Sequence, residues 1–237
     1  MKNLIIIPGW AGTKETWQDF IKLAEKDFNV FCINMPCFGD ESCPDKAWGV
    51  EDYAEFVKNK IKELNLQGEK ILLGHSFGGQ ISAYLIAHEY HLVDKLILSG
   101  PAVFRPKNYL RRFFFFIIAK VGKIIFKLPL LEKFSVFVKK IFYRSISSPD
   151  YFVTSEIKKE IFKKIIRQDL TAILPNIENQ TLIIWGDKDA YVSVKNASKL
   201  QKLIPDSELE IVAGGRHGLH IQMPEKFLQI IKKFTNR

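Results

Sequence analysis

Short apolar runs alternate with longer amphipathic segments along most of the chain. The apolar runs contain many β-branched residues and are bounded by Gly, Pro or Asn, which is typical of buried strands. They predict strands at residues 4–7, 30–33, 71–73, 96–98, 182–185 and 209–212. The segments between them have helical periodicity and predict helices near residues 16–25, 50–64, 78–88, 194–203 and 224–234.

This alternation predicts an α/β fold with a mainly parallel sheet of about six strands and helices on both faces. The functional groups of such a sheet gather at the carboxyl ends of its strands. The alternation stops between residues 101 and 175, where helical sequence rich in Phe and in basic residues replaces it. We therefore predict a core made of residues 1–100 and 176–237, with residues 101–175 inserted into it.

The inserted segment accounts for more than the chain's whole net charge of +9, because the remainder of the chain is slightly acidic. Residues 102–175 contain 16 Lys and Arg, 5 Asp and Glu, and 11 of the 19 Phe, whereas the remainder contains 19 basic and 21 acidic residues. As a helix, the segment would carry a basic stripe that includes Arg112, Lys120, Lys123 and Lys127. We expect this stripe to face solvent, with weak contact to an anionic membrane surface or an acidic partner as the alternative. Nucleic acid is not expected as a partner, because no recognised binding motif accompanies the charge.

The sharpest local pattern is G-x-S-x-G at residues 74–78, between a predicted strand and a predicted helix. A tight strand-to-helix turn of this kind holds its serine in a strained conformation with the hydroxyl exposed. Glycines two residues to either side, Gly74 and Gly78, let neighbouring backbone approach. The alternative is a glycine-rich turn whose serine caps the helix. The strand before the turn and the helix after it favour Ser76 as a nucleophile.

A serine hydroxyl is a weak nucleophile at neutral pH, so this interpretation requires a base and a third group that orients the base. Asp187 and Asp189 follow the predicted strand at residues 182–185, and His217 follows the strand at residues 209–212. The chain order is therefore serine, aspartate, histidine.

This order and the G-x-S-x-G turn resemble the α/β-hydrolase superfamily, and the resemblance covers nearly the whole chain outside the insertion. Residues 7–12 resemble the family's oxyanion loop, residues 35–39 its P-G-F-G loop, and residues 217–225 its closing histidine segment. The resemblance implies an α/β-hydrolase fold in which the first two strands of the family are missing. It also implies that the insertion is a helical cap, which excludes water and shapes the substrate pocket.

The family pattern also assigns the remaining site residues. By position, the backbone N–H groups of Trp10 and Phe77 would form the oxyanion hole. Pro8 departs from the pattern, because the family usually has His there. The family's acid commonly stands three residues after the glycine that ends its strand, which selects Asp189 and leaves Asp187 as a turn residue.

Four other histidines compete with His217 for the role of base. His75 adjoins the nucleophile but is expected to point away from it. His88 and His91 lie near a helix end and are expected at the surface. His220, one turn beyond His217, is expected to be a pocket or packing residue. Only His217 follows a strand at the position that the family pattern requires.

The resemblance therefore implies a serine hydrolase that cleaves carboxylic esters, lactones included, through an acyl-enzyme on Ser76. Thioester hydrolysis, C–C bond hydrolysis and acyl transfer stay open, because the same groups can perform them. Epoxide hydrolases and haloalkane dehalogenases of this fold use Asp where this chain has Ser76, and serine aminopeptidases need acidic cap residues, so these classes are disfavoured. A membrane-peripheral binding protein that uses the amphipathic cap as an anchor is the hypothesis from another class.

Neither a cofactor nor a metal ion is expected. The three cysteines, Cys32, Cys37 and Cys43, have no metal-type spacing and no histidine cluster near them. Their odd number and the lack of an apolar leader favour a reducing compartment, so we expect a cytoplasmic protein. The expected partner is a small-molecule ester with an apolar acyl group.

Overall fold

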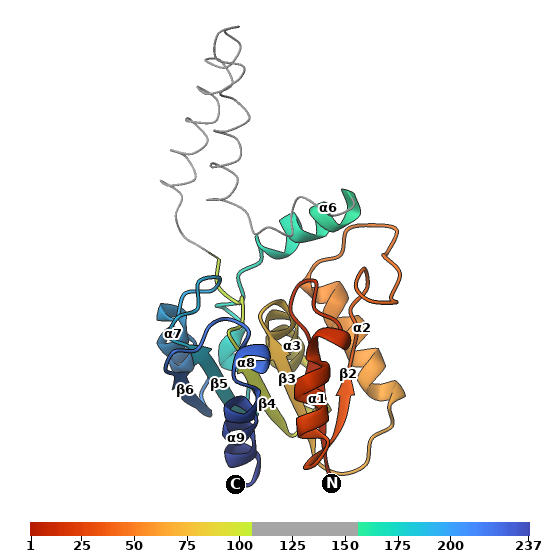
Figure 1. Ribbon diagram of the computed structural model, residues 1–237. Coiled ribbons are helices and arrows are strands. Elements are labelled where there is room, and N and C mark those ends of the chain that lie inside the picture. The colour runs from red at the N-terminus through yellow and green to blue at the C-terminus, as the bar shows by residue number, and fades with distance from the viewer. Residues whose placement is uncertain (106–155) are drawn as a thin grey trace, which may run out of the picture. The chain divides into compact units, whose positions relative to one another are not determined.

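All six predicted apolar runs form strands of a single sheet (Figure 1). The strands are β1 (Lys2–Ile7), β2 (Phe28–Cys32), β3 (Lys70–His75), β4 (Lys95–Ser99), β5 (Gln180–Gly186) and β6 (Ser207–Val212). Every pairing is parallel, and the spatial order is β2-β1-β3-β4-β5-β6. The predicted α/β fold with a parallel sheet of six strands is confirmed.

The computed structural model describes residues 1–105 and 156–237. Its contacts divide the chain into one unit of Met1–Arg105 with Glu160–Arg237 and a second unit of Pro106–Lys159. Most of the cap predicted at residues 101–175, with its basic stripe, therefore lies outside the described residues. Within the described ranges, no helix is long and apolar enough to cross a membrane.

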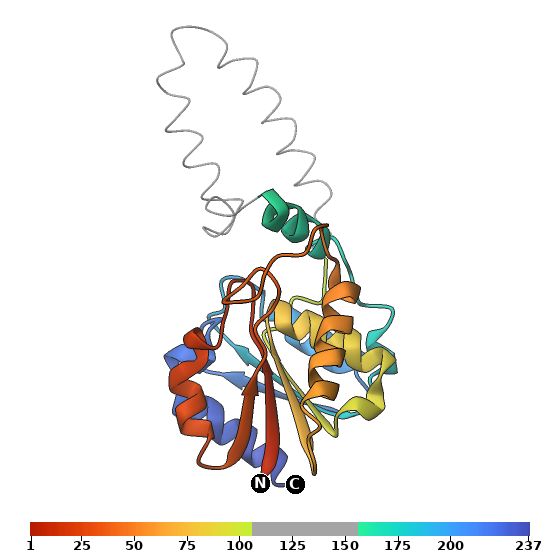
Figure 2. The same ribbon diagram turned by 90° about the vertical axis from the view of Figure 1, so that its right-hand side faces the viewer.

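Helices cover both faces of the sheet, as the alternation of strands and helices predicts (Figure 2). Helices α1 and α9 pack against each other on one face, and α2 and α3 pack against each other on the other. The helices are α1 (Gln18–Ala24), α2 (Val50–Glu63), α3 (Phe77–His88), α6 (Glu156–Ile165), α7 (Lys195–Leu203), α8 (Leu219–Gln222) and α9 (Pro224–Thr235). Short 3₁₀ turns lie at η1 (Glu15–Trp17), η2 (Tyr90–Leu92) and η5 (Leu174–Asn176). All five predicted helices form, and α8 is a turn that the sequence analysis did not predict.

The core between the sheet and the α1/α9 layer is almost wholly apolar. Alternate residues of the central strands, such as Leu4 and Ile6 of β1, face this layer because side chains alternate along a strand. Trp17 and Phe20 from the start of the α1 segment and Phe227 from α9 fill it, each about 1% exposed. The central strands β1, β3, β4 and β5 are continuous apolar runs because the opposite face of the sheet is covered as well.

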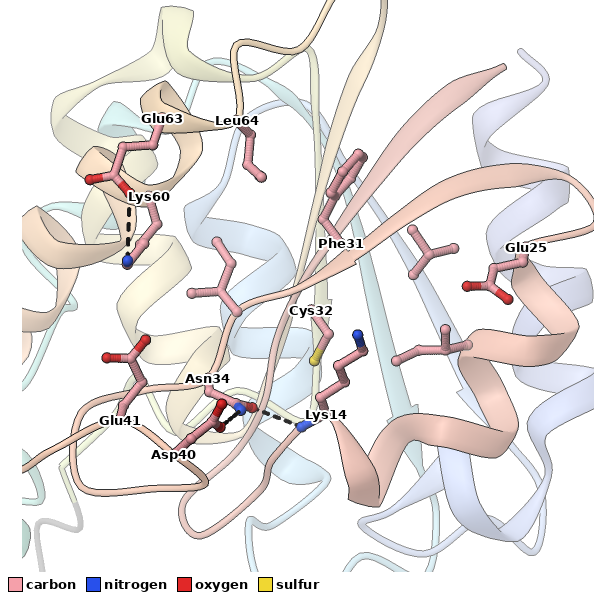
Figure 3. Close-up of a pocket in the computed structure, with 13 residues that line it drawn as sticks. Lys14, Glu25, Phe31, Cys32, Asn34, Asp40, Glu41, Lys60, Glu63 and Leu64 are labelled. Carbon is pink, nitrogen blue, oxygen red and sulfur yellow. Dashed lines mark hydrogen bonds and ion pairs between the residues drawn. The ribbon is translucent and has the colours of Figure 1, made fainter.

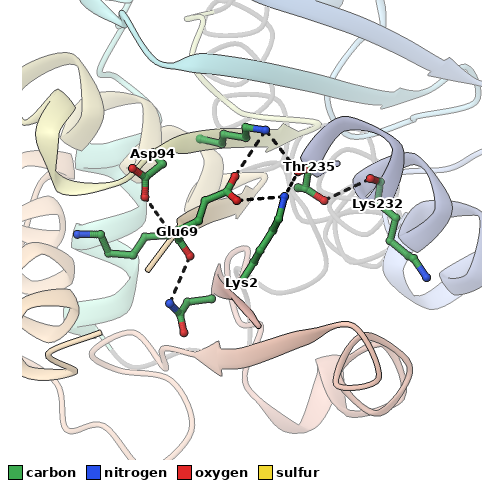
Figure 4. Close-up of polar contacts among 8 residues, drawn as sticks. Lys2, Glu69, Asp94, Lys232 and Thr235 are labelled. Atoms are coloured by element: carbon green, nitrogen blue, oxygen red, sulfur yellow. Dashed lines mark hydrogen bonds and ion pairs between the residues drawn. The ribbon is translucent and has the colours of Figure 1, made fainter. Parts of the chain in front are cut away.

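Polar contacts tie the amino ends of the strands to the end of α9 (Figure 4). Glu69 pairs with the ammonium groups of Lys2, at 3.0 Å, and Lys95, at 3.5 Å. Both lysines also donate to the carbonyl oxygen of Thr235, where the negative end of the α9 dipole favours a cation. These ion pairs therefore stabilise the amino-terminal edge of the sheet, opposite to the carboxyl edge where functional groups are expected.

A disulfide joins Cys37 and Cys43 in the loop after β2, and the sequence analysis did not predict this pairing. Cys32 is a free, partly buried thiol, and burial raises its pKa to about 12. The thiol is therefore protonated and weakly reactive at neutral pH. Disulfides persist mainly in oxidising compartments, so this pairing does not support the expected cytoplasmic location. The location stays a prediction.

Candidate active site

Ser76 occupies the turn between β3 and α3, where its backbone has φ 53° and ψ −113°. A non-glycine residue in this region costs about 1–3 kcal/mol and persists only where its surroundings enforce the conformation. Here the N–H of Ser76 donates to the carbonyl of Ser99 at the end of β4, at 2.9 Å. The carbonyl of Ser76 accepts from the N–H groups of Gln80, at 3.0 Å, and Ala102, at 3.1 Å. The structure thus contains the strained strand-to-helix turn that the glycine pattern predicts.

Gly78 lets the first turn of α3 approach the end of β1. A Cβ atom at this position would overlap the carbonyl oxygens of Ile7 and Pro8. Only glycine can therefore bring the Ser76 turn against the loop that begins at Pro8 and contains Trp10.

The loops that follow β5 and β6 are joined by backbone hydrogen bonds. The N–H of Asp187 donates to the carbonyl of Val212 at 3.2 Å, and the N–H of Lys188 donates to the carbonyl of Gly215 at 2.8 Å. Gly186 permits this approach, because a Cβ atom there would overlap the carbonyl of Gly215. Residues nearly 30 positions apart in the chain are consequently held side by side.

This arrangement brings Asp189, and not Asp187, to His217. Oδ2 of Asp189 lies 2.7 Å from Nδ1 of His217. Oδ1 of Asp189 accepts from the N–H groups of Tyr191, at 2.8 Å, and Val192, at 2.9 Å, and the side chain is 1% exposed. A carboxylate held in this way favours the His217 tautomer with a proton on Nδ1, which leaves Nε2 unprotonated and able to act as a base. Oδ1 of Asp187 is buried without a hydrogen-bond partner within the described part of the chain.

Two histidines that the sequence analysis placed outside the catalytic group pack beside His217. The ring of His75 lies 4.7 Å from the ring of His217 and 5.0 Å from that of His220, measured between centroids. His220 in turn stacks on Trp17, with centroids 3.7 Å apart and planes 4° from parallel. The three-residue spacing of His217 and His220 was the only local signal for this group, and nothing in the sequence pointed to His75. His88 and His91 are exposed.

Burial keeps both of these additional imidazoles neutral. It lowers the pKa of His220 to about 3, with the nearby His217 as a smaller cause. Burial also lowers the pKa of His75 well below its ordinary value, and the neighbouring His220 and His217 add to the effect. Protonation of either ring is therefore unfavourable in the folded protein at neutral pH.

We predict that acid destabilises the protein partly through these two histidines. Below pH 6.5 these histidines are protonated in the unfolded chain but not in the folded protein. Because the unfolded state then binds more protons, the free energy of unfolding falls as pH falls. Each histidine contributes a slope of up to about 1.4 kcal/mol per pH unit between its unfolded and folded pKa values. Urea denaturation at pH 7, 6, 5 and 4 measures this slope. His220→Phe should have a shallower slope than the wild type, and identical slopes would contradict the assignment.

Of the two residues expected to supply the oxyanion hole, Phe77 directly follows Ser76, and Trp10 belongs to the loop after β1 that lies against the start of α3. Phe77 is the first residue of α3, so its N–H has no acceptor within the helix. No hydrogen bond within residues 1–105 and 156–237 uses the N–H of Trp10 or Phe77. The Trp10 ring packs against Phe77, Phe38 and Phe162, with centroids 5.8, 4.9 and 5.1 Å away. We call these four residues the aromatic cluster.

A groove of about 500 Å³ runs along β2, one of the two edge strands of the sheet, between α1 and α2 (Figure 3). Its charged lining combines Lys14 and Lys60 with Glu25, Asp40 and Glu63, among others, and contains no histidine or serine. It is therefore separate from the residues that follow β3, β5 and β6. In the described ranges, no three His, Cys, Asp or Glu side chains are grouped so that they could hold a metal ion.

Comparison with known proteins identifies the family. Residues 2–126 match the model of the alpha/beta hydrolase fold family. The chain is 26% identical over 253 residues to the AB hydrolase superfamily protein YisY of Bacillus subtilis (strain 168), covering 99% of this chain and 92% of that protein. It is 23% identical over 251 residues to a pimeloyl-(acyl-carrier protein) methyl ester esterase of Vibrio vulnificus (strain YJ016), with 99% and 94% covered. The crystal structure of a membrane phospholipase A, described as a bacterial virulence factor, matches with a TM-score of 0.76 at 23% identity, covering 99% of this chain and 78% of that one. This chain belongs to the α/β-hydrolase fold family.

Proposed function

We propose that the protein is a serine hydrolase that cleaves carboxylic esters, lactones included, through an acyl-enzyme on Ser76. The observation that carries the proposal is the 2.7 Å hydrogen bond between Asp189 and His217. It lies in loops at the same edge of the sheet as the strained turn that presents Ser76. Nucleophilic acyl transfer requires an oriented base and an accessible serine hydroxyl at one site, and Ser76 is partly exposed.

Each residue has a defined role in this reaction. His217 Nε2 takes the proton of the Ser76 hydroxyl as its oxygen attacks the ester carbonyl, and it then gives the proton to the departing alcohol. Asp189 stays ionised and stabilises the imidazolium that forms on His217. The N–H groups of Trp10 and Phe77 stabilise the oxyanion, at about 3 kcal/mol per donor. Water then attacks the acyl-enzyme with His217 as the base, and the acid is released.

The relatives support ester hydrolysis without naming the substrate of this chain. The Vibrio vulnificus relative is named as a methyl ester esterase, and a human relative, 21% identical over 98% of this chain, is named as a monoacylglycerol lipase. Thioester hydrolysis, C–C bond hydrolysis and acyl transfer remain alternatives, because they use the same groups. The membrane-anchor hypothesis depends on the cap, which lies mostly outside the described residues.

Labelling with a fluorophosphonate tests the proposal directly, because this probe reacts with an activated serine and ignores an inert one. We expect the purified protein to take up one equivalent, and mass spectrometry of a proteolytic digest should place it on Ser76. Ser193, an exposed serine far along the chain, is the internal control and should stay unmodified. A folded protein that takes up no probe would exclude the serine hydrolase.

We predict that catalytic efficiency depends on the length of the acyl chain. Trp10 and Phe162, the partly exposed members of the aromatic cluster, offer apolar surface near the Ser76 turn. Burial of each substrate CH₂ gains about 0.8 kcal/mol, or roughly fourfold in kcat/KM. The value of kcat/KM should therefore rise from acetyl to about butyryl or hexanoyl esters and then fall when the chain no longer fits. A series of p-nitrophenyl esters measures the profile. A flat profile would contradict an apolar acyl pocket.

A further inference from the structure

Four rings, those of Trp17, His220, His75 and His217, pack in series from the core toward the candidate catalytic pair. Trp17 is stacked on His220, His220 contacts His75, and His75 contacts His217, while the edge of Trp17 also lies against His75 with centroids 6.0 Å apart. The first three are each no more than 6% exposed. We call this group the ring series. Its members come from η1, the end of β3, α8 and the loop after β6.

The His217 ring is in contact with two other rings. The centroid of the buried His75 ring lies 4.7 Å from that of His217, and the centroid of the exposed Tyr191 ring lies 5.2 Å from it. The hydrogen bond to Asp189 restrains Nδ1 of His217 but still permits the ring to tilt about that bond. Packing against the buried His75 ring restricts this remaining freedom.

His75 is also connected to the backbone of the nucleophile. Its Nδ1 lies 3.1 Å from the carbonyl oxygen of Ser99, and because a carbonyl can only accept, this nitrogen carries the proton. The same carbonyl accepts the N–H of Ser76 at 2.9 Å. One oxygen atom thus positions both the Ser76 turn and the ring that contacts His217.

His220 is a costly residue for a purely structural role. Its Nδ1 atom is buried and has no hydrogen-bond partner within the described part of the chain. A buried polar atom without a partner lowers stability, and an apolar ring of similar size would fill the space without this cost. His220 nevertheless stacks on Trp17 in nearly parallel geometry and lies against His75.

We propose that His75 and His220 are positioning residues: the His75 ring, supported by His220 on Trp17, holds the imidazole of His217 so that Nδ1 stays on Asp189 and Nε2 is available to Ser76. The proposal rests on the proposed function. Because both supporting rings are neutral, the imidazolium formed on His217 during the reaction is the only cation in the series. Neither positioning residue exchanges a proton with the substrate.

Two variants test the two supports, and both are measured below the melting temperature of the least stable protein. His220→Ala removes the ring that stacks on Trp17, and His75→Asn keeps a donor for the Ser99 carbonyl but removes the ring that contacts His217. We expect each variant to lower kcat about tenfold while KM changes less than twofold, since substrate binding is not altered. His220→Phe keeps the stacking ring and should restore kcat to within about threefold of the wild type. His91→Ala, at an exposed histidine, is the matched control and should leave kcat unchanged.

A spectroscopic readout separates this proposal from the proposed function. The proton between His217 and Asp189 gives a far-downfield proton resonance, which does not depend on any substrate. We expect this resonance to broaden in His220→Ala and His75→Asn and to stay sharp in His220→Phe and His91→Ala. Wild-type kcat and a sharp resonance in both folded test variants would overturn the proposal.

Two further outcomes are informative. If His220→Ala does not fold, His220→Gln, which is polar but has no ring to stack, is measured in its place with the same expected loss. A wild-type protein that shows the sharp resonance but takes up no fluorophosphonate would overturn the proposed function. The response of the resonance in the variants would still decide whether the ring series positions His217.

Discussion

Ser76→Ala should remove nearly all ester hydrolysis and leave the fold intact. Without the hydroxyl no acyl-enzyme forms, and the residual rate comes from oxyanion binding alone, so the expected loss in kcat is on the order of 10⁶-fold. The fold should persist because Ser76 is held through its backbone N–H and carbonyl, which alanine retains. Turnover of an activated ester, together with a melting curve for each protein, measures both effects.

His217→Ala should behave in the same way, because base and nucleophile act as one unit. The double variant should therefore lose no more activity than either single variant, whereas independent contributions would multiply. His220→Ala should be far milder, because His220 does not exchange a proton with the substrate. If folded Ser76→Ala retained more than a tenth of wild-type turnover, Ser76 would not be the nucleophile.

Asp189→Asn should lower kcat by about 10⁴-fold with little change in fold. The amide can donate a hydrogen bond to Nδ1 of His217, which favours the tautomer with the proton on Nε2, so that this nitrogen can no longer accept the proton of Ser76. Oδ1 of Asp189 has two backbone donors, from Tyr191 and Val192, and an asparagine oxygen can still accept both. The measurement is turnover of the same activated ester across pH 6 to 9.

Asp187→Asn is the matched control, since it makes the same chemical change two residues away. Its carboxylate does not contact His217, and its Oδ1 atom has no hydrogen-bond partner among the described residues, so little activity should be lost. A larger loss at Asp187 than at Asp189 would show that the catalytic acid had been assigned to the wrong residue.

Local patterns were sufficient for the secondary structure and for the turn at Ser76. The central strands are recognisable because a parallel sheet covered on both faces needs uninterrupted apolar runs, and the six predicted runs coincide with β1 to β6. The turn is recognisable because two glycines are required within four residues of each other: Gly74 by the packing of α3 against the end of β3, and Gly78 by the approach of α3 to the end of β1. Both features impose their residue requirements within a short stretch of sequence, so a local pattern can reveal them.

The contacts around His217 depend on tertiary structure. Its partner Asp189 is 28 residues away in sequence, and the choice against Asp187 follows from the way the β5 and β6 loops bond to each other through Lys188 and Gly215. His75 is 142 positions from His217, and its ring reaches the site only because β3 and β6 end at the same edge of the sheet. No local periodicity encodes contacts between segments so distant in the chain; the packing of the sheet and its helices determines them.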